Sequence, residues 1–372
     1  MARIRLVLAL LVLFSCTAPS EDQIKIGLDF PLSGGLAVYG QPLLEGVSLA
    51  VDEINAAGGV NGKLIKIVIE DNQGKPPVAA IAAQKLIEQD NVLLLLSTLV
   101  GPTGAIAPIT EQHNKILLYA AAVDSFAEQN KLVFKDSVDS FVDCSLLAEY
   151  VLARGETNIA LLGADTEFTQ KCIEGLKLKG IKPNVELYVK GAEPDYRTML
   201  TKIKAAKPNA IVLSAYSDDC LTIWKNVDEL KINATFLLPF TQTGCGDEGS
   251  TKVMPKDSKI IGLDFVIDKN STGFVTFIDS FKKKYGKEPS LLFFTTLGYD
   301  WIGYLRDAIA KCPELSTACI STELETTKYQ GAWGKVEFTP KHVTKRPRTL
   351  VLFENSTCNR LVELNSPCKS IT

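Results

Sequence analysis

The sequence has few histidines and lacks the usual motif context for histidine chemistry. Only two of its 372 residues are histidine, His113 and His342, and neither lies in an H-E-x-x-H segment. Histidine is the most frequent general base and a frequent zinc ligand, so this scarcity argues against a histidine-based triad or a zinc hydrolase. No G-x-x-x-x-G-K-[ST] segment occurs, and no C-x-x-C pair is present. We therefore expect no catalytic residue, no metal and no cofactor.

The chain also lacks a strong charge bias and any apolar run long enough to span a bilayer. Its formal net charge is -3, which argues against a nucleic-acid partner. The longest apolar runs, Leu6 to Phe14 and Val92 to Val100, are each shorter than the roughly 20 residues that a membrane helix needs. With 46% hydrophobic residues, a chain of this length can bury two domain-sized cores.

The N-terminal segment is typical of an export signal. Positive charge in Met1 to Arg5 precedes the apolar run and then Ser15-Cys16, which predicts a signal peptide over residues 1–15. The segment Leu13-Phe14-Ser15-Cys16 resembles a bacterial lipobox, so we expect lipidation of Cys16 and a tether over residues 16–23. Because Phe14 is atypical there, cleavage by ordinary signal peptidase is the alternative. A lipid anchor alone would then hold the protein in the periplasm or at the outer cell surface.

Eight further cysteines favour disulfides, because an even count in an exported chain is typical of cross-linked proteins. They are Cys144, Cys172, Cys220, Cys245, Cys312, Cys319, Cys358 and Cys368. Proximity in sequence favours pairing Cys312 with Cys319 and Cys358 with Cys368. Pairs of Cys144 with Cys172 and of Cys220 with Cys245 are one choice among the remaining possibilities.

The opening residues predict a βαβ unit around which the rest of the chain is organised. Ile24 to Phe30 is a short apolar run typical of a buried parallel strand, and Pro31 to Gly40 forms a loop. A helix with one apolar stripe begins at Pro42, and Lys63 to Glu70 returns as a strand. Ligands of such units meet the loop at the carboxyl end of the first strand, where Tyr39 lies. The three glycines of this loop do not form G-x-G-x-x-G.

The alternation of strands and helices then runs twice, which predicts an α/β fold of two doubly wound, parallel-sheet lobes. No low-complexity linker separates the rounds, so we expect a hinge of several chain crossings. The expected first lobe comprises residues 24–138 and 268–330, and the expected second lobe comprises residues 139–267 and 331–372.

Several segments resemble the type I periplasmic binding proteins of the leucine/isoleucine/valine-binding group. They are P-L-S-G from Pro31, Tyr39-Gly40, and E-G-V-S-L-A-V-D-E-I-N-A-A-G-G-V-N-G-K from Glu45 to Lys63. Gly331 to Phe338 resembles the late strand between the lobes in that family. The resemblance covers nearly the whole mature chain. It implies a monomeric, non-catalytic receptor that closes two lobes on a small-molecule solute and delivers it to an ABC permease in the membrane.

The resemblance also implies a set of ligand-binding positions, in which Gly101 would act through its backbone N–H. These positions are Tyr39, Leu99, Gly101, Thr103, Ala122, Asp124, Phe168, Tyr216 and Gln242. The alternative is a purely structural role, which is packing for the tyrosines and Phe168 and helix capping for Thr103.

The family's acidic partner for a ligand ammonium falls near Thr241-Gln242, where this chain has no carboxylate. A buried charge without a partner is costly, so this pocket favours a solute other than a free α-amino acid. Asp124, Asp165 and Glu167 are the acidic residues that could still pair with a cation.

Two other functions compete with the importer receptor. A sensory receptor that signals through a separate membrane partner would use the same fold. An enzyme is supported only by acidic and hydroxyl residues at strand ends, which any α/β cleft has.

Overall fold

The computed structural model describes residues 23–363, apart from 191–194, 242, 243, 247, 257, 266, 345, 355 and 356. The predicted signal peptide, Cys16, the tether, Gln242 and Cys368 lie outside the described residues, so the pair of Cys368 with Cys358 is not described. Among the helices of the described part, none combines the length and the apolar character that crossing a bilayer requires.

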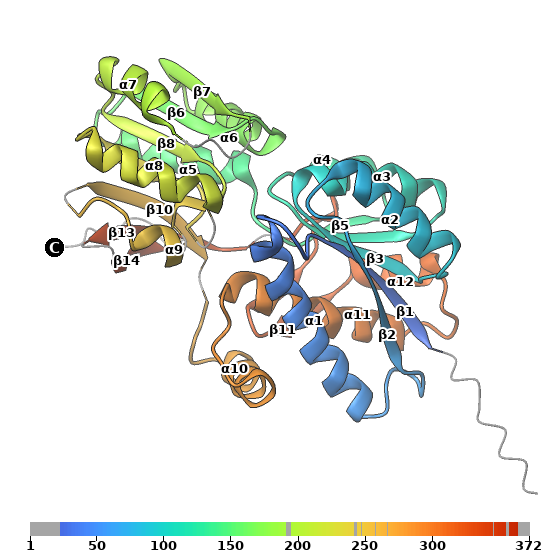
Figure 1. Cartoon of the computed structure of the whole chain (residues 1–372). Coiled ribbons are helices and arrows are strands. Elements are labelled where there is room, and N and C mark those ends of the chain that lie inside the picture. The colour runs from blue at the N-terminus through green and yellow to red at the C-terminus, as the bar shows by residue number, and fades with distance from the viewer. Residues whose placement is uncertain are drawn as a thin grey trace, which may run out of the picture.

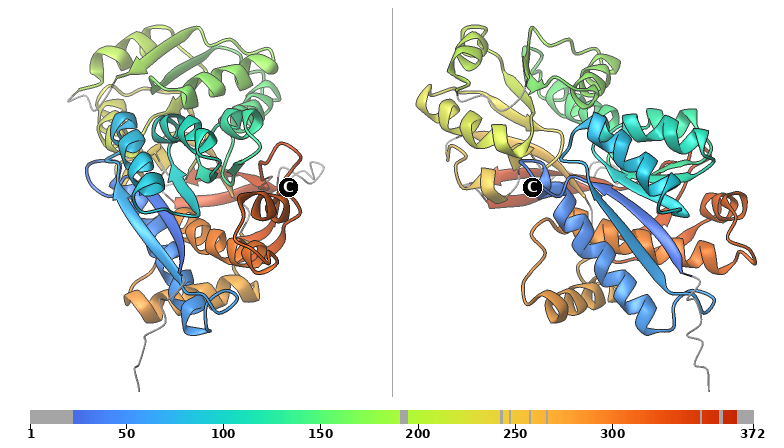
Figure 2. Two further views of the ribbon diagram at one scale, coloured as in Figure 1. Left: turned by 90° about the vertical axis from the view of Figure 1, so that its right-hand side faces the viewer. Right: turned by 45° about the vertical axis from the view of Figure 1, so that its right-hand side comes forward.

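The first lobe is built on a five-stranded parallel sheet with the order β2-β1-β3-β4-β5 (Figure 1). Its strands are β1 (Ile24–Phe30), β2 (Ile65–Asp71), β3 (Leu94–Thr98), β4 (Ile116–Ala120) and β5 (Val133–Lys135). Its helices are α1 (Ala37–Ala56), α2 (Pro76–Glu88), α3 (Val100–Gln112), α4 (Ser125–Gln129), α10 (Thr272–Tyr285), α11 (Leu292–Ala310) and α12 (Thr317–Glu325). Helices α1 and α11, far apart in sequence, lie side by side (Figures 1 and 2). They approach closely because Gly46 and Gly298 have no side chain; a Cβ on Gly46 would lie 2.0 Å from the Thr295 carbonyl oxygen.

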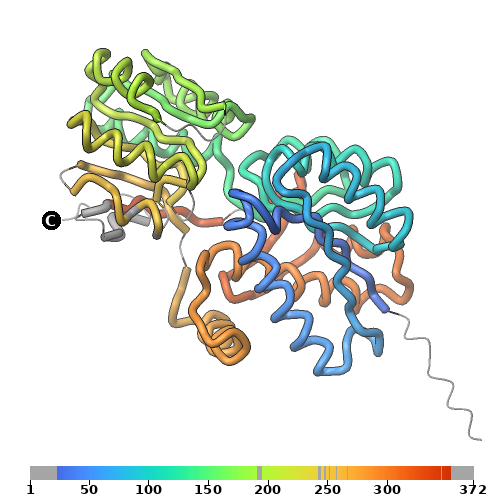
Figure 3. The backbone as a smooth tube through the Cα atoms, in the orientation of Figure 1, coloured from blue at the N-terminus to red at the C-terminus, as the bar shows by residue number. Residues whose placement is uncertain are grey.

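The second lobe repeats this architecture. Its parallel strands follow the order β7-β6-β8-β9-β10, and two antiparallel strands, β13 and β14, extend the sheet beyond β10. The strands are β6 (Ile159–Ala164), β7 (Val185–Val189), β8 (Ala210–Ser214), β9 (Thr235–Leu238), β10 (Lys259–Phe265), β13 (Arg348–Glu354) and β14 (Thr357–Glu363). The helices are α5 (Ser140–Leu152), α6 (Glu167–Leu178), α7 (Arg197–Ala205), α8 (Ser217–Glu229) and α9 (Glu248–Thr251). The predicted fold of two doubly wound lobes is confirmed, and the tube view shows the two lobes as separate bodies (Figure 3).

Two local predictions are wrong. The loop predicted to reach Gly40 ends earlier, because α1 begins at Ala37 and tolerates Pro42 within it, so Tyr39 lies in the first turn of a helix. Residues 331–338 do not form a strand between the lobes. Instead β11 (Lys328–Gly331) and β12 (Gly334–Glu337) form a hairpin that contacts α10 and α11. The predicted domain boundary at residue 331 falls inside this hairpin.

Three disulfides cross-link the described part of the chain. They join Cys144 to Cys172, Cys220 to Cys245, and Cys312 to Cys319. The first connects α5 to α6, and the second connects α8 to the turn at Gly244–Gly246. The bond between Cys312 and Cys319 is the pair that proximity in sequence favoured, and the other two bonds are the choice named among the remaining possibilities.

The chain passes between the lobes in three places, where the structure describes residues 136–139, residues 267–271, and residues 338–344 with 346 and 347. The first and third run side by side, because the Thr344 N–H donates to the Lys135 carbonyl at 3.0 Å. Buried ion pairs join them and the adjoining elements: Arg346 Nη2 lies 2.7 Å from Asp136 Oδ2, and Arg348 Nε lies 2.9 Å from Asp143 Oδ1. These crossings form the predicted multi-segment connection, and its interior is charged.

Asp29, at the carboxyl end of β1, carries a carboxyl group whose environment links stability to pH. The residue is fully buried; Asn72 Nδ2 donates to its Oδ1 at 2.8 Å, while Oδ2 has no partner within the described part. Burial raises the pKa of Asp29 from 3.8 to about 7, although the Asn72 hydrogen bond opposes this shift. The folded state therefore holds this proton more tightly than the unfolded chain does, and stability falls as pH rises from about 4 to about 7.

Replacing Asp29 by asparagine is expected to flatten part of this pH dependence, because an amide cannot ionise at this buried position. Urea unfolding at pH 4.5 and pH 8 measures the change, with the exposed Asp228→Asn as the matched control. Asp143 and Asp300, whose pKa values burial raises to about 6 and about 7, add a slope of the same sign that remains in the variant. A variant with the full pH slope of the parent protein would contradict the assignment to Asp29.

Candidate functional site

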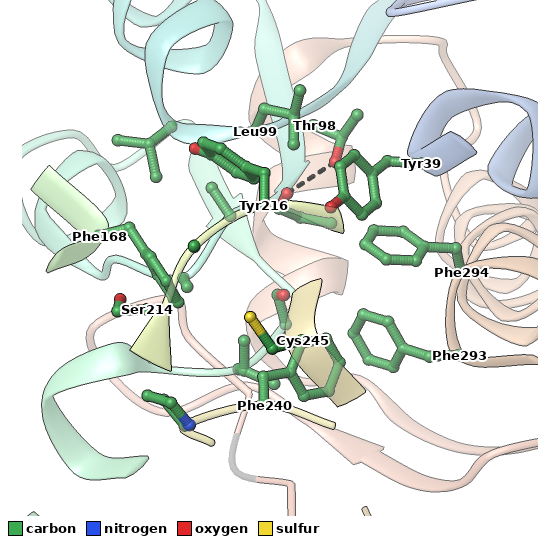
Figure 4. A pocket seen from close by; sticks show the side chains of 18 of the residues that line it. Tyr39, Thr98, Leu99, Phe168, Ser214, Tyr216, Phe240, Cys245, Phe293 and Phe294 are labelled. Carbon is green, nitrogen blue, oxygen red and sulfur yellow. Dashed lines mark hydrogen bonds between the residues drawn. The ribbon is translucent and has the colours of Figure 1, made fainter. Parts of the chain in front are cut away.

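A cavity lies between the two lobes, where the carboxyl ends of strands from both sheets face each other (Figure 4). The end of β3 contributes Thr98 and Leu99, and the end of β4 contributes Ala120 with the two alanines that follow. From the second lobe come Ser214 at the end of β8 and Phe240 after β9. The empty space between these residues amounts to about 690 Å³, a figure that includes open solvent at the mouth of the cavity.

Six aromatic side chains line the cavity, and each lobe supplies three of them. Tyr39 of α1 and Phe293 and Phe294 of α11 come from the first lobe; Phe168 of α6, Tyr216 and Phe240 come from the second. The ring centroids of Tyr39 and Phe294 lie 5.7 Å apart, those of Tyr39 and Tyr216 6.3 Å, and those of Phe240 and Phe293 5.2 Å. The aromatic side chains of the two lobes therefore surround one space (Figure 4).

The floor of the cavity is continuous with the crossing segments. Phe293 stacks on Phe265 with centroids 4.4 Å apart, and the Trp333 ring packs edge-on against Phe293 at 4.2 Å. Above these rings lie the hinge cations: the Arg346 guanidinium is 4.9 Å from the Trp333 centroid and that of Arg348 is 4.3 Å from the Phe265 centroid. A change in the angle between the lobes would therefore act directly on the rings of Phe265, Phe293 and Trp333.

Few polar groups face this cavity, and most are already paired. Thr98 Oγ1 donates to the Ala120 carbonyl at 2.9 Å, and Ser214 Oγ lies 3.2 Å from Thr169 Oγ1. Ser137 is 6% exposed, and its hydroxyl makes no hydrogen bond within the described part of the chain. Of the described residues that line the cavity, none carries a charged side chain.

Backbone strain marks the cavity edge at Leu99. This residue precedes α3 with φ 68° and ψ 148°, a conformation that nearly all non-glycine residues avoid. Its N–H donates to the Ala120 carbonyl at 3.1 Å, which ties the strained residue to the end of β4. Such strain is found most often at functional sites, and here it sits on the wall of the cavity.

Hydrogen bonds join the lobes on two sides of the cavity. The Tyr39 hydroxyl of α1 lies 3.0 Å from Ser217 Oγ of α8, and the Ser217 N–H donates to it at 3.2 Å. Ser125 Oγ of α4 donates to Glu167 Oε1 of α6 at 2.9 Å. Because these bonds connect different lobes, they exist only while the cleft is closed.

Tyr39→Phe is expected to weaken the affinity for a ligand of the cavity about fivefold, because the closed form loses about 1 kcal/mol of hydrogen bonding while the ring stays. Titration calorimetry measures the change. Tyr285→Phe is the control, since it also deletes one hydroxyl hydrogen bond, a 2.9 Å bond to the Glu45 carbonyl away from the cavity. Equal affinities for the two variants would contradict a role of Tyr39 in closure.

The structure brings five of the nine predicted ligand-binding residues to the cavity. These are Tyr39, Leu99, Ala122, Phe168 and Tyr216. Their common feature is a position just after a strand or in the first turn of the next helix, where the topology of both lobes points them into the cleft.

Three other predicted residues do not line the cavity. Gly101 lies exposed beside Pro76, and Thr103 is fully buried with Oγ1 3.2 Å from Ser97 Oγ. Asp124 forms an ion pair with Lys135; burial raises the pKa of this carboxyl, and the lysine opposes the shift. The ninth residue, Gln242, lies outside the described residues.

The two other acidic residues that sequence analysis offered as cation partners also stay off the cavity wall. Asp165 is exposed in a neighbouring hollow, and Glu167 accepts the hydrogen bond from Ser125.

Sequence analysis did not offer most residues of the cavity wall as ligand-binding residues, among them Ser137, Phe240, Phe293 and Phe294. Phe293 and Phe294 stand in the apolar run Leu291 to Phe294, which has no feature to separate it from core. Ser137 lies in a crossing segment, whose path depends on the packing of both lobes.

One glycine pattern near the cavity resembles a dinucleotide fingerprint in sequence alone. Gly244 to Gly249 has the spacing G-x-G-x-x-G, but it does not link a strand to a long helix. Cys245 is bonded to Cys220, and its carbonyl accepts a hydrogen bond from Trp224 Nε1 at 2.9 Å. This segment is a cross-linked turn on the cavity wall.

Comparison with known proteins places this architecture among solute receptors. Residues 23–355 match the family model described as periplasmic binding protein. A leucine-, isoleucine-, valine-, threonine- and alanine-binding protein of Pseudomonas aeruginosa is 23% identical over 340 residues, which cover 88% of this chain and 89% of that protein.

Solved structures share the fold. A branched-chain amino acid transporter substrate-binding protein of Streptococcus pneumoniae, in complex with isoleucine, has a TM-score of 0.80 at 23% identity and covers 90% of this chain and 97% of that one. A solute-binding protein of an ABC transporter from R. palustris, in complex with benzoate, has a TM-score of 0.80 at 17% identity, with 91% and 95% covered.

Proposed function

This chain belongs to the periplasmic binding protein family, and on that basis we propose that it is the solute receptor of an ABC importer. It captures a small molecule, an amino acid or a related compound, between its lobes by hinge closure. The closed lobes then present a combined surface to the permease in the membrane.

The observation that carries this proposal is the cavity itself. It lies at the carboxyl ends of strands from both sheets, its wall is divided between the lobes, and the lobes are joined by three chain segments. A site built in halves is complete only when the lobes meet, so a ligand that contacts both halves favours the closed form. The named ligands of relatives, from leucine to benzoate, support a compact solute.

The location of the protein is part of the proposal. Charged residues, an apolar run and Cys16 at the N-terminus support export and lipid anchoring in the periplasm or at the outer cell surface. We place the hinge in the three crossing segments and expect a monomer that acts without catalysis, as a receptor that releases its solute unchanged.

A thermal-shift screen of the purified mature protein against amino acids, amides, short peptides, aromatic acids and polyamines tests the receptor function. A ligand at one hundred times its dissociation constant stabilises the folded state by about 2.7 kcal/mol, which raises the midpoint by several degrees. If no compound of the panel raises the unfolding midpoint, the result counts against solute capture. The same result would favour the other candidate function, a receptor that signals through a separate membrane partner.

A further inference from the structure

We propose that the ligand of this receptor is a compact aromatic or alicyclic compound that carries no cationic amino group and has a single hydrogen-bonding substituent. The inference rests on the proposed function and specifies its substrate class.

The first argument is that the described residues of the cavity wall carry no charged side chain. A free amino acid brings an ammonium and a carboxylate, and both lose their hydration when the lobes close. An uncompensated buried charge costs several kcal/mol, so a site for a zwitterion needs a partner for each charge. Of the described residues on the cavity wall, none is aspartate, glutamate, lysine, arginine or histidine.

The acidic residues nearest the cavity have other surroundings. Asp165, Asp218 and Asp219 line a neighbouring hollow that shares Tyr216 with the cavity. Asp165 and Asp218 are exposed to water, and Asp219 accepts a hydrogen bond from the Tyr196 hydroxyl. Asp124 is engaged with Lys135. A cation held among the aromatic rings therefore lacks a carboxylate partner in the described part of the site.

The second argument is the shape of the wall. Three aromatic side chains from each lobe converge on the cavity, with Phe293 and Phe294 of one lobe facing Phe240 and Phe168 of the other (Figure 4). Aromatic faces and edges gain most from contact with another ring, beyond the apolar area that is buried. Because the two halves meet only on closure, a ring between them stabilises the closed form directly.

The third argument is the hydroxyl of Ser137. Ser137 lines the cavity and is 6% exposed as a residue, and its side chain makes no hydrogen bond within the described part of the chain. The Thr98 and Ser214 hydroxyls already have partners at 2.9 and 3.2 Å. A hydroxyl on an otherwise apolar wall offers one hydrogen-bonding contact to a ligand, so it matches one polar substituent on an otherwise apolar compound.

Matched compounds test the class. Titration calorimetry compares phenylalanine, 3-phenylpropanoate, 3-phenylpropanamide and 2-phenylethylamine, and also compares leucine with 4-methylpentanoate and 4-methylpentanamide. We expect 3-phenylpropanamide to bind at least ten times more tightly than phenylalanine and 2-phenylethylamine, and more tightly than 4-methylpentanamide. Equal binding of the two amides would show that no ring is required and would overturn the proposed class. Phenylalanine, leucine or phenylethylamine binding as tightly as the amine-free compounds would overturn the proposal.

The experiment distinguishes a failure of the proposed ligand class from a failure of the proposed receptor function. If none of these compounds binds while an amino acid, a peptide or a polyamine of the broad screen does, the ligand class is wrong and the receptor function stands. If no compound of either set binds, both fail.

Ser137→Ala tests the polar contact. Affinity for 3-phenylpropanamide is expected to fall about five- to tenfold, while affinity for the matching hydrocarbon, propylbenzene, stays unchanged. Ser145→Ala is the control, because Ser145 is a buried serine whose hydroxyl donates to the Val142 carbonyl at 2.8 Å, away from the cavity. A purely structural effect of Ser137 would lower all affinities alike, and that result would overturn its assignment.

Discussion

Replacing Arg346 by methionine is expected to lower the free energy of unfolding by about 3–5 kcal/mol, because it leaves a buried carboxylate without its partner. Arg346 Nε and Nη2 donate to Asp136 at 2.9 and 2.7 Å, and the two side chains are 2% and 0% exposed. Methionine keeps much of the apolar stem that packs near Trp333, so the loss reports mainly on charge. Urea unfolding monitored by circular dichroism measures it.

Two further variants show whether the effect arises from the unpaired charge. Arg197→Met removes an exposed arginine that pairs with Asp195 and Glu229 at the surface, and it is expected to change stability by no more than the error of the measurement. The double variant Arg346→Met with Asp136→Leu removes both charges and should recover much of the loss. A single variant as stable as Arg197→Met would show that this hinge pair contributes little.

Phe168→Ala is expected to weaken ligand affinity about thirtyfold, equivalent to about 2 kcal/mol, and to leave the fold intact. Phe168 stands in the first turn of α6 and faces the cavity from the second lobe (Figure 4). It is only partly buried and belongs to none of the hydrophobic core clusters of the described residues, so its ring has the cavity as its apolar surroundings. Calorimetric titration and the unfolding midpoint are measured on the same sample.

Leu178→Ala, at the far end of the same helix, is the matched control. Leu178 is 61% exposed, so its truncation should change neither affinity nor stability measurably. Equal affinities for the two variants would show that the ligand does not contact Phe168 and would place the binding site elsewhere in the cleft.

The sequence predicts the sheets well because buried parallel strands are encoded locally. Ile24–Phe30 forms a strand with the predicted bounds, since it is a short apolar run followed by loop signals. Helix starts are encoded less clearly. Helix α1 begins before Pro42, because packing of Tyr39 against the core outweighs the preference of proline for the first turn.

The residues of the binding site also fall into two groups, those that the local sequence predicts and those that depend on contacts between distant segments. Leu99, Ala122 and Tyr216 reach the cavity because they follow strands, and the doubly wound topology fixes where strands end. Phe240 and Phe293 could not be placed in this way. Their rings meet at 5.2 Å only through the packing of the crossing segments and of α11, and such contacts between distant parts of the chain leave no periodic signal in the sequence.

Small-angle X-ray scattering with and without the tightest-binding compound of the thermal-shift screen tests the central claim, that the protein is a receptor whose lobes close on a solute. The account predicts a smaller radius of gyration at saturating ligand, because the bonds of Tyr39 to Ser217 and of Ser125 to Glu167 form only in the closed state. An identical scattering profile with and without the bound compound would show a rigid cleft and contradict capture by hinge closure.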